Sequence, residues 1–194
     1  MSTTNQAAKI LADSFLHYPL MKYAFKECSE EQRSKNLLQL YHYCSQAASL
    51  YGGVLVSPDQ KGALIWLSGN NFPLGVFREI KSGMWAIPFQ IGLPATLRLM
   101  HHDAVTETWI KKNSREKFGY LWCVGVEKAA RGKGYSRRLI EQSIYDMKQK
   151  GLNEFWLKTE DPQNVLIYKK LGFEVMYETV VKSSGLSSWA LLKK

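Results

Sequence analysis

Two glycines set among basic residues form the segment of this sequence best suited to bind a phosphate group. Residues 131–136 read Arg-Gly-Lys-Gly-Tyr-Ser and lie between an apolar run and a stretch with helical spacing of apolar residues. The start of a helix leaves backbone N–H groups without partners, and glycines let a phosphate approach them closely. Arg131 and Lys133 add positive charge, so the segment predicts a phosphate or pyrophosphate site.

The spacing of these glycines excludes one phosphate-binding loop and disfavours another. A P-loop needs glycine at position 127 and Ser or Thr at position 134, where this sequence has Glu127 and Gly134. A dinucleotide fingerprint would place its third glycine at position 137, which is Arg. A nucleotide or dinucleotide binder and a tight turn without a ligand remain open as alternatives.

The second half of the chain predicts the elements that hold the glycine turn. Residues 120–126 are apolar apart from one glycine, which is typical of a central strand buried on both faces. The spacing of apolar residues after the turn predicts a helix that closes at Gly151. Further on, the pattern predicts a short strand, a short helix, and two more strands at 155–157, 165–171, 173–177 and 186–192.

The first half is less regular. Its spacing predicts helices over residues 5–16 and 30–50, the second ended by Gly52-Gly53, and then a β-hairpin at 54–57 and 63–67. Residues 69–100, rich in Gly, Pro and apolar groups, predict short helices and loops, and residues 103–113 a further helix.

The glycine turn and a later motif together resemble the GNAT superfamily of acetyltransferases. The family's cofactor loop reads Gln/Arg-x-x-Gly-x-Gly/Ala after a central strand, and Arg131, Gly134 and Ser136 match it, with Ser136 as a departure. Residues 164–174, Asn-Val-Leu-Ile-Tyr-Lys-Lys-Leu-Gly-Phe-Glu, are similar to the family's stretch of Asn, Tyr and Gly-Phe. The resemblance covers roughly residues 120–177. A first strand before the first helix, usual in the family, is not visible.

The resemblance implies a fold and an activity. We expect an α/β (α+β mixed) protein whose central sheet is mixed and mostly antiparallel, with helices on both faces. The expected organisation is a single domain, residues 1–194, with an apolar insert of helices and loops around residues 69–100. The implied enzyme is an N-acetyltransferase that moves acetyl from acetyl-CoA directly to a primary amine in a ternary complex, without a metal.

The resemblance also implies a cofactor site made largely of backbone groups. The central strand would splay from its neighbour and offer free backbone groups near Val124 and Val126 to the pantetheine arm. The N–H groups of residues 132–136 would hold the pyrophosphate. The hydroxyl of Ser136 and the side chain of Asn164 also suit helix capping. The complete predicted set is Val124, Gly125, Val126, Arg131, Gly132, Lys133, Gly134, Tyr135, Ser136 and Asn164.

Two residues are predicted to be catalytic. Tyr168 matches the family's acid, but a phenol with a pKa of about 10 would protonate a thiolate of pKa about 8.5 uphill by roughly 2 kcal/mol. A hydrogen bond that strengthens as the thiolate forms is therefore the expected role. Glu127 is the candidate base, with a solvated carboxylate as the alternative. Glu160 and Asp161 are weaker candidates, and the adjacent His101 and His102 are expected at the surface.

Composition constrains the partners. The net charge of +9, with basic residues gathered over residues 128–138, fits an anionic partner or a solvated basic face. A non-enzymatic nucleic-acid-binding module is an alternative, but no recognition helix or zinc-finger pattern is visible. A CoA-binding domain without turnover is another. Three scattered cysteines and the lack of a signal-peptide pattern predict a cytoplasmic protein without a membrane or nucleic-acid partner.

The sequence also leads to expectations for the acceptor and for the oligomeric state. We expect a small-molecule or protein amine as the acceptor and a monomer or homodimer as the assembly. The aromatic-rich stretch of residues 72–100 carries little charge, and we expect it to cover one side of the acceptor cleft.

Overall fold

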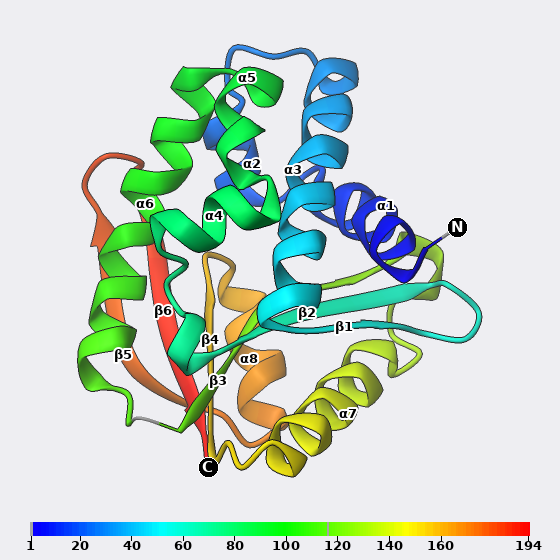
Figure 1. Cartoon of the computed structure of the whole chain (residues 1–194), viewed down its shortest axis with the longest axis vertical. Helices are drawn as coiled ribbons and strands as arrows, with labels where there is room; N and C mark the ends of the chain where they lie inside the picture. Colours follow the sequence, from blue (N-terminus) through cyan, green and yellow to red (C-terminus); the bar gives the residue numbers. More distant parts are fainter. Residues whose placement is uncertain (1, 116) are drawn as a thin grey trace.

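A sheet of six strands forms the centre of the computed structural model, which describes residues 2–115 and 117–194 (Figure 1). Within this part of the chain the strand order is β1-β2-β3-β4-β6-β5, and β3–β4 is the one parallel pair. The expected mixed, mostly antiparallel sheet is therefore confirmed. The strands are β1 (Gly52–Val56), β2 (Gly62–Ser68), β3 (Phe118–Val126), β4 (Glu154–Thr159), β5 (Glu174–Val181) and β6 (Leu186–Lys193).

Most helices lie where the sequence pattern predicts them. The α-helices are α1 (Thr3–Phe15), α2 (Pro19–Ala24), α3 (Glu30–Tyr51), α4 (Val76–Ser82), α5 (Ile87–Ile91), α6 (Leu93–Asn113), α7 (Tyr135–Gln149) and α8 (Pro162–Lys170). Short 3₁₀ turns are η1 (Gly69–Asn71), η2 (Met84–Ala86) and η3 (Lys128–Ala130). The helix expected at 103–113 begins earlier, at Leu93, because Pro94 is tolerated in a first turn. The short helix α2 was not predicted.

Alternating residues of β2 pack against helices on opposite faces of the sheet. Ala63 and Ile65 join a core cluster with residues of α1 and α3. Leu64 and Trp66 join a second cluster with residues of α7 and α8. Figure 1 shows α1 and α3 on one side of the sheet and α7 and α8 on the other. The period of two along a strand produces this double covering, and the expected flanking of the sheet on both faces is confirmed.

Strands β3 and β4 separate halfway along the sheet. Their parallel pairing runs from Phe118, opposite Glu154, to Leu121, opposite Leu157, and stops there. On its other edge β3 stays paired with β2 as far as Val126, with a shift of register that leaves Trp122 as an extra residue. Such a bulge bends the strand that carries it. The edge of β3 beyond Leu121 therefore faces a gap between the two strands.

In residues 2–115 and 117–194 no helix combines the length and the apolarity required to cross a bilayer.

Candidate active site

A cavity of about 600 Å³ lies at the gap between β3 and β4. Residues 121–124 of β3 line one side and residues 157–160, at the end of β4, line the other. Tyr168 and Asn164 of α8 contribute to the wall, as do residues of α1, α3, α6 and the insert. The cavity thus joins three predicted site residues, Val124, Asn164 and Tyr168, to the amino-terminal half of the chain, whereas residues 125–136 do not line it.

Tyr168 is placed in this wall by its helix and the turn that follows. Its side chain is buried and packs edge-on against Phe173, with ring centroids 5.9 Å apart. Burial, followed by the nearby Cys123 and Glu160, raises the pKa of Tyr168 well above its usual 10.0. Within the described residues the hydroxyl makes no hydrogen bond. It stays neutral at physiological pH and can donate to a ligand in the cavity.

The glycine turn leads from β3 into α7. Gly132 and Gly134 have φ of 77° and 79°, so both occupy the left-handed region that glycine adopts without strain. Gly134 is the N-cap of α7, and the N–H groups of residues 132–136 donate no hydrogen bond to another described residue. The turn and the helix start therefore present unpaired donors, as an anion site requires.

The structure shows the surroundings of three side chains of the predicted cofactor site, Arg131, Tyr135 and Ser136. The guanidinium of Arg131 donates to the backbone carbonyls of Val126 and Ser14, each at 3.4 Å, and so ties the turn to β3 and α1. The Ser136 hydroxyl does not cap α7, because Gly134 is the N-cap, and that expectation is wrong. The Tyr135 hydroxyl donates to Asp59, and its ring lies under Arg138.

Asn164 lines the cavity and does not cap its helix. The N-cap of α8 is Asp161, which accepts a hydrogen bond from the Gln163 N–H at 2.9 Å. The Asn164 amide donates to the Thr159 hydroxyl at 3.4 Å. Of its two predicted roles, the capping role is therefore wrong.

Glu127 lies at the end of β3, where its backbone N–H donates to the Lys61 carbonyl at 2.8 Å. Its side chain is exposed and is not among the described residues that line the cavity. Its role as the base stays a prediction.

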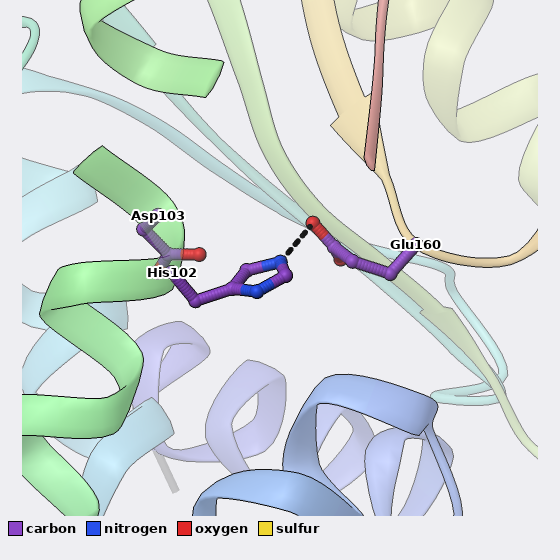
Figure 2. A group of neighbouring side chains, drawn as sticks. All are labelled: His102, Asp103 and Glu160. Atoms are coloured by element: carbon purple, nitrogen blue, oxygen red, sulfur yellow. Dashed lines mark hydrogen bonds and ion pairs between the residues drawn. The ribbon is translucent and has the colours of Figure 1, made fainter. Parts of the chain in front are cut away.

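A polar cluster joins α6 to the end of β4 beside the cavity, and Figure 2 shows His102 pointing toward Glu160. His102 of α6 is fully buried, and its Nε2 lies 3.3 Å from Glu160 Oε1. The expectation of a surface position for His102 is wrong, because α6 turns it inward, whereas His101 is exposed. Lys158 Nζ lies 2.6 Å from Asp103 Oδ1 and 2.8 Å from Glu160 Oε1. His102, Asp103 and Glu160 have the spacing of a metal site, but the Lys158 ammonium supplies the positive charge here.

Glu160 is the most completely paired acid of this cluster. Besides Lys158 and His102, the hydroxyls of Tyr18 and Ser188 lie within 3.0 Å and 3.4 Å of its oxygens. Burial alone would raise the pKa of Glu160, but the charge of Lys158 and the bonds from His102 and Lys158 outweigh it and lower the pKa to about 2. Glu160 is therefore an ionised structural acid that fixes one wall of the cavity.

Glu107 lies one turn after Asp103 on α6, and its pKa is shifted in the opposite direction from that of Glu160. It lines the cavity, and in the described part of the chain its one hydrogen-bond donor is the Tyr120 hydroxyl, at 3.3 Å. Burial, followed by the charge of Asp103, raises the pKa of Glu107 to about 8. The sequence spacing could have indicated that these acids share a face. Asp103 and Glu107 are four residues apart on a helix, and Lys158 and Glu160 are two apart at a strand end.

Comparisons with known proteins agree with this geometry. Residues 95–173 match the model of the acetyltransferase (GNAT) family. An uncharacterized N-acetyltransferase of Schizosaccharomyces pombe is 27% identical over 172 residues, covering 87% of this chain and 69% of that protein.

Two solved structures share the fold over nearly the whole chain. Arylalkylamine N-acetyltransferase 2 of Aedes aegypti is 17% identical with a TM-score of 0.65, covering 100% of this chain and 95% of that one. A mosquito arylalkylamine N-acetyltransferase-like protein is 13% identical with a TM-score of 0.59, covering 97% and 94%.

The sheet, the split between its central strands and the helix that starts at a glycine turn define an acetyltransferase fold, with a cavity at the split. Residues 95–173 match the acetyltransferase (GNAT) family, and the resemblance predicted from the two motifs is confirmed.

Proposed function

We propose that this acetyltransferase moves the acetyl group of acetyl-CoA directly to a primary amine while both substrates are bound. The amine nitrogen attacks the thioester carbonyl, a carbon–nitrogen bond forms, the carbon–sulfur bond breaks and the CoA thiolate leaves. The separation of β3 from β4 carries the proposal, because it leaves backbone groups of β3 unpaired in the wall of a cavity that also contains Tyr168. The N-acetyltransferase name of the yeast relative supports a nitrogen acceptor.

The cofactor would bind along β3 and at the start of α7. The free edge around Val124 and Val126 offers hydrogen bonds to the amide groups of pantetheine. The unpaired N–H groups of residues 132–136 and the positive end of the α7 dipole suit the pyrophosphate. The exposed Lys133 adds positive charge, and Asn164 is available to the acyl end from the cavity wall.

Tyr168 would donate a hydrogen bond to the thiolate as it forms. Its raised pKa makes complete proton transfer still less favourable than for a free phenol, so stabilisation of the leaving group by a neutral donor is its role. Glu127 remains the proposed base, acting from outside the cavity through water. Replacing Glu127 by Gln should lower the rate at limiting amine concentration, and an unchanged pH–rate profile would remove it from the mechanism.

Thermal unfolding of the purified protein tests the cofactor first. Acetyl-CoA, NAD and a DNA duplex are added separately, each at about 100 times the dissociation constant expected for a true ligand. Binding to the folded state at that level adds about 2.7 kcal/mol of stability. For a chain of this size that shifts the unfolding midpoint by about 5–10 °C. Stabilisation by acetyl-CoA alone supports the proposal, and a response to NAD or DNA without one to acetyl-CoA contradicts it.

Assembly and location belong to the same proposal. We infer a single domain that works in the cytoplasm as a monomer or homodimer. Size-exclusion chromatography with light scattering tests the assembly, and fluorescence microscopy of a tagged chain tests the location.

A further inference from the structure

The cavity combines apolar walls with an excess of carboxylates, and this combination points to a class of acceptor. We propose that the acceptor is a primary amine with an apolar body, whose ammonium group binds beside Glu107 and Asp103 of α6. The inference rests on the proposed function, because it names the second substrate of the same cavity.

Apolar side chains make up most of the cavity wall. They come from the amino-terminal helices, the insert and α6, and include Phe15, Tyr41, Phe72, Met84, Trp85 and Leu99. A volume of about 600 Å³ is within the range of small-molecule sites. Trp85 and Met100 line the cavity and are also 59% and 60% exposed, so an apolar rim leads in from solvent. The insert therefore forms one side of a site for an apolar group.

The charged groups in the wall are mostly acidic, although the whole chain has a net charge of +9. The wall contains four acids and one base. The acids are Glu79, Asp103, Glu107 and Glu160, and the base is Lys158. Lys158 binds Asp103 and Glu160, which leaves Glu107 with a hydroxyl as its described partner. A carboxylate excess of this kind favours a cationic ligand over a neutral or anionic one.

The two features together select among amines. Glu107 keeps its proton at neutral pH while the cavity is empty, and an ammonium group beside it would favour the carboxylate, so that binding of the amine releases this proton to solvent. The apolar body of a monoamine would then contact the aromatic walls. A polyamine would need a suitably placed acid for each further ammonium group, and most of the wall is apolar, so an unmatched ammonium would be costly. An amine that also carries a carboxylate, such as an amino acid, would place that carboxylate among the cavity's acids. An aromatic or aliphatic monoamine fits all of these conditions.

A panel of acceptors tests the class of substrate. The full-length protein is given acetyl-CoA with phenethylamine, hexylamine, spermidine or a lysine-containing peptide, and free thiol is measured. We expect kcat/KM for phenethylamine and hexylamine to exceed that for spermidine and the peptide by at least about tenfold. Turnover confined to spermidine or the peptide would overturn the inference and leave the proposed function intact.

A pair of isosteric ligands tests the role of Glu107. Phenethylamine and phenethyl alcohol differ at the head group, and their binding is measured by calorimetry without acetyl-CoA, so the result does not depend on turnover. Glu107→Gln should weaken phenethylamine about 10- to 100-fold and leave the alcohol nearly unchanged. Glu141→Gln, which removes an exposed acid of α7, should change neither. Equal losses for both ligands, or no loss, would overturn the role of Glu107.

A second variant keeps the test valid if Glu107→Gln folds poorly. Ala104 is exposed yet lines the cavity, so Ala104→Trp fills space without disturbing the core. We expect it to raise the KM of phenethylamine at least tenfold while leaving the dissociation constant of acetyl-CoA unchanged. An unchanged KM would place the acceptor elsewhere. A protein that binds phenethylamine but fails to bind acetyl-CoA would instead contradict the proposed function.

Discussion

At the scale of the residue, the Tyr168 hydroxyl is a donor in the cavity wall that bonds to no other described residue. We expect Tyr168→Phe to lower kcat by about 10- to 100-fold, the size of one hydrogen bond to a charged group. The dissociation constant of acetyl-CoA should stay the same, because the bond forms as the thiolate develops. Steady-state kinetics and calorimetry measure the two quantities. Tyr145→Phe, at an exposed position of α7, is the control, and an equal loss of cofactor binding in Tyr168→Phe would contradict the assignment.

Lys158 is the residue on which the buried acids depend. Lys158→Met should reduce the free energy of unfolding by about 3–5 kcal/mol, because it leaves Asp103 and Glu160 without their buried partner. Chemical denaturation measures the loss. Lys35→Met, which breaks an exposed pair with Glu31, should cost less than about 1 kcal/mol.

A double variant separates charge from packing at this position. Adding Glu160→Gln to Lys158→Met should recover part of the stability, since one unpaired charge is removed. No recovery would show that the loss in Lys158→Met comes from packing.

At the scale of the element, α7 has a glycine of positive φ at each end. Gly134 (79°) starts the helix at the glycine turn, and Gly151 (76°) follows its end. Gly134→Val and Gly151→Val should cost similar stability, because both force a β-branched residue into the left-handed region. Only Gly134→Val should also weaken acetyl-CoA, by blocking the approach of the phosphates. Melting curves with and without acetyl-CoA compare the two, and equal weakening by both variants would argue against a phosphate site at the turn.

The elements also differ in how far sequence patterns could predict them. The helix over α7 and the strand β3 follow from runs of apolar residues with clear periods. The start of α6 was misplaced, because Pro94 and the glycines before it carry loop signals that a first helical turn tolerates. The bulge at Trp122 lies in a uniformly apolar run, which does not show where pairing with a neighbour stops.

At the scale of the whole molecule, Glu107 couples stability to pH. Asp103 acts on it from α6, Lys158 from β4, Glu160 from the residue after β4, and Tyr120 from β3. Its pKa rises from 4.5 unfolded to about 8 folded, so the folded state keeps a proton that the unfolded state has lost. This contribution is complete below pH 4.5 and is lost as the pH rises towards about 8.

The free energy of unfolding of the ligand-free protein should therefore fall between about pH 5 and pH 8. Glu107→Gln should flatten that fall, while Glu141→Gln should preserve it. Glu160, with a pKa lowered to about 2, acts in the opposite direction and only below pH 4.5, outside this window. Denaturation at a series of pH values makes the comparison, and the same slope in Glu107→Gln would exclude this carboxyl as its source.

The sequence by itself determined the family resemblance, the glycine turn before a helix and the position of Tyr168 on a short helix, because each depends on residue types at short spacing along the chain. Only the tertiary structure decided where β3 leaves β4 and which acids face the cavity. His102 and Glu107 belong to α6, whereas Lys158 and Glu160 lie at the end of β4. Packing α6 against the sheet brings these side chains together. Periodicity within either segment indicates which face is buried, but not which residues that face contacts.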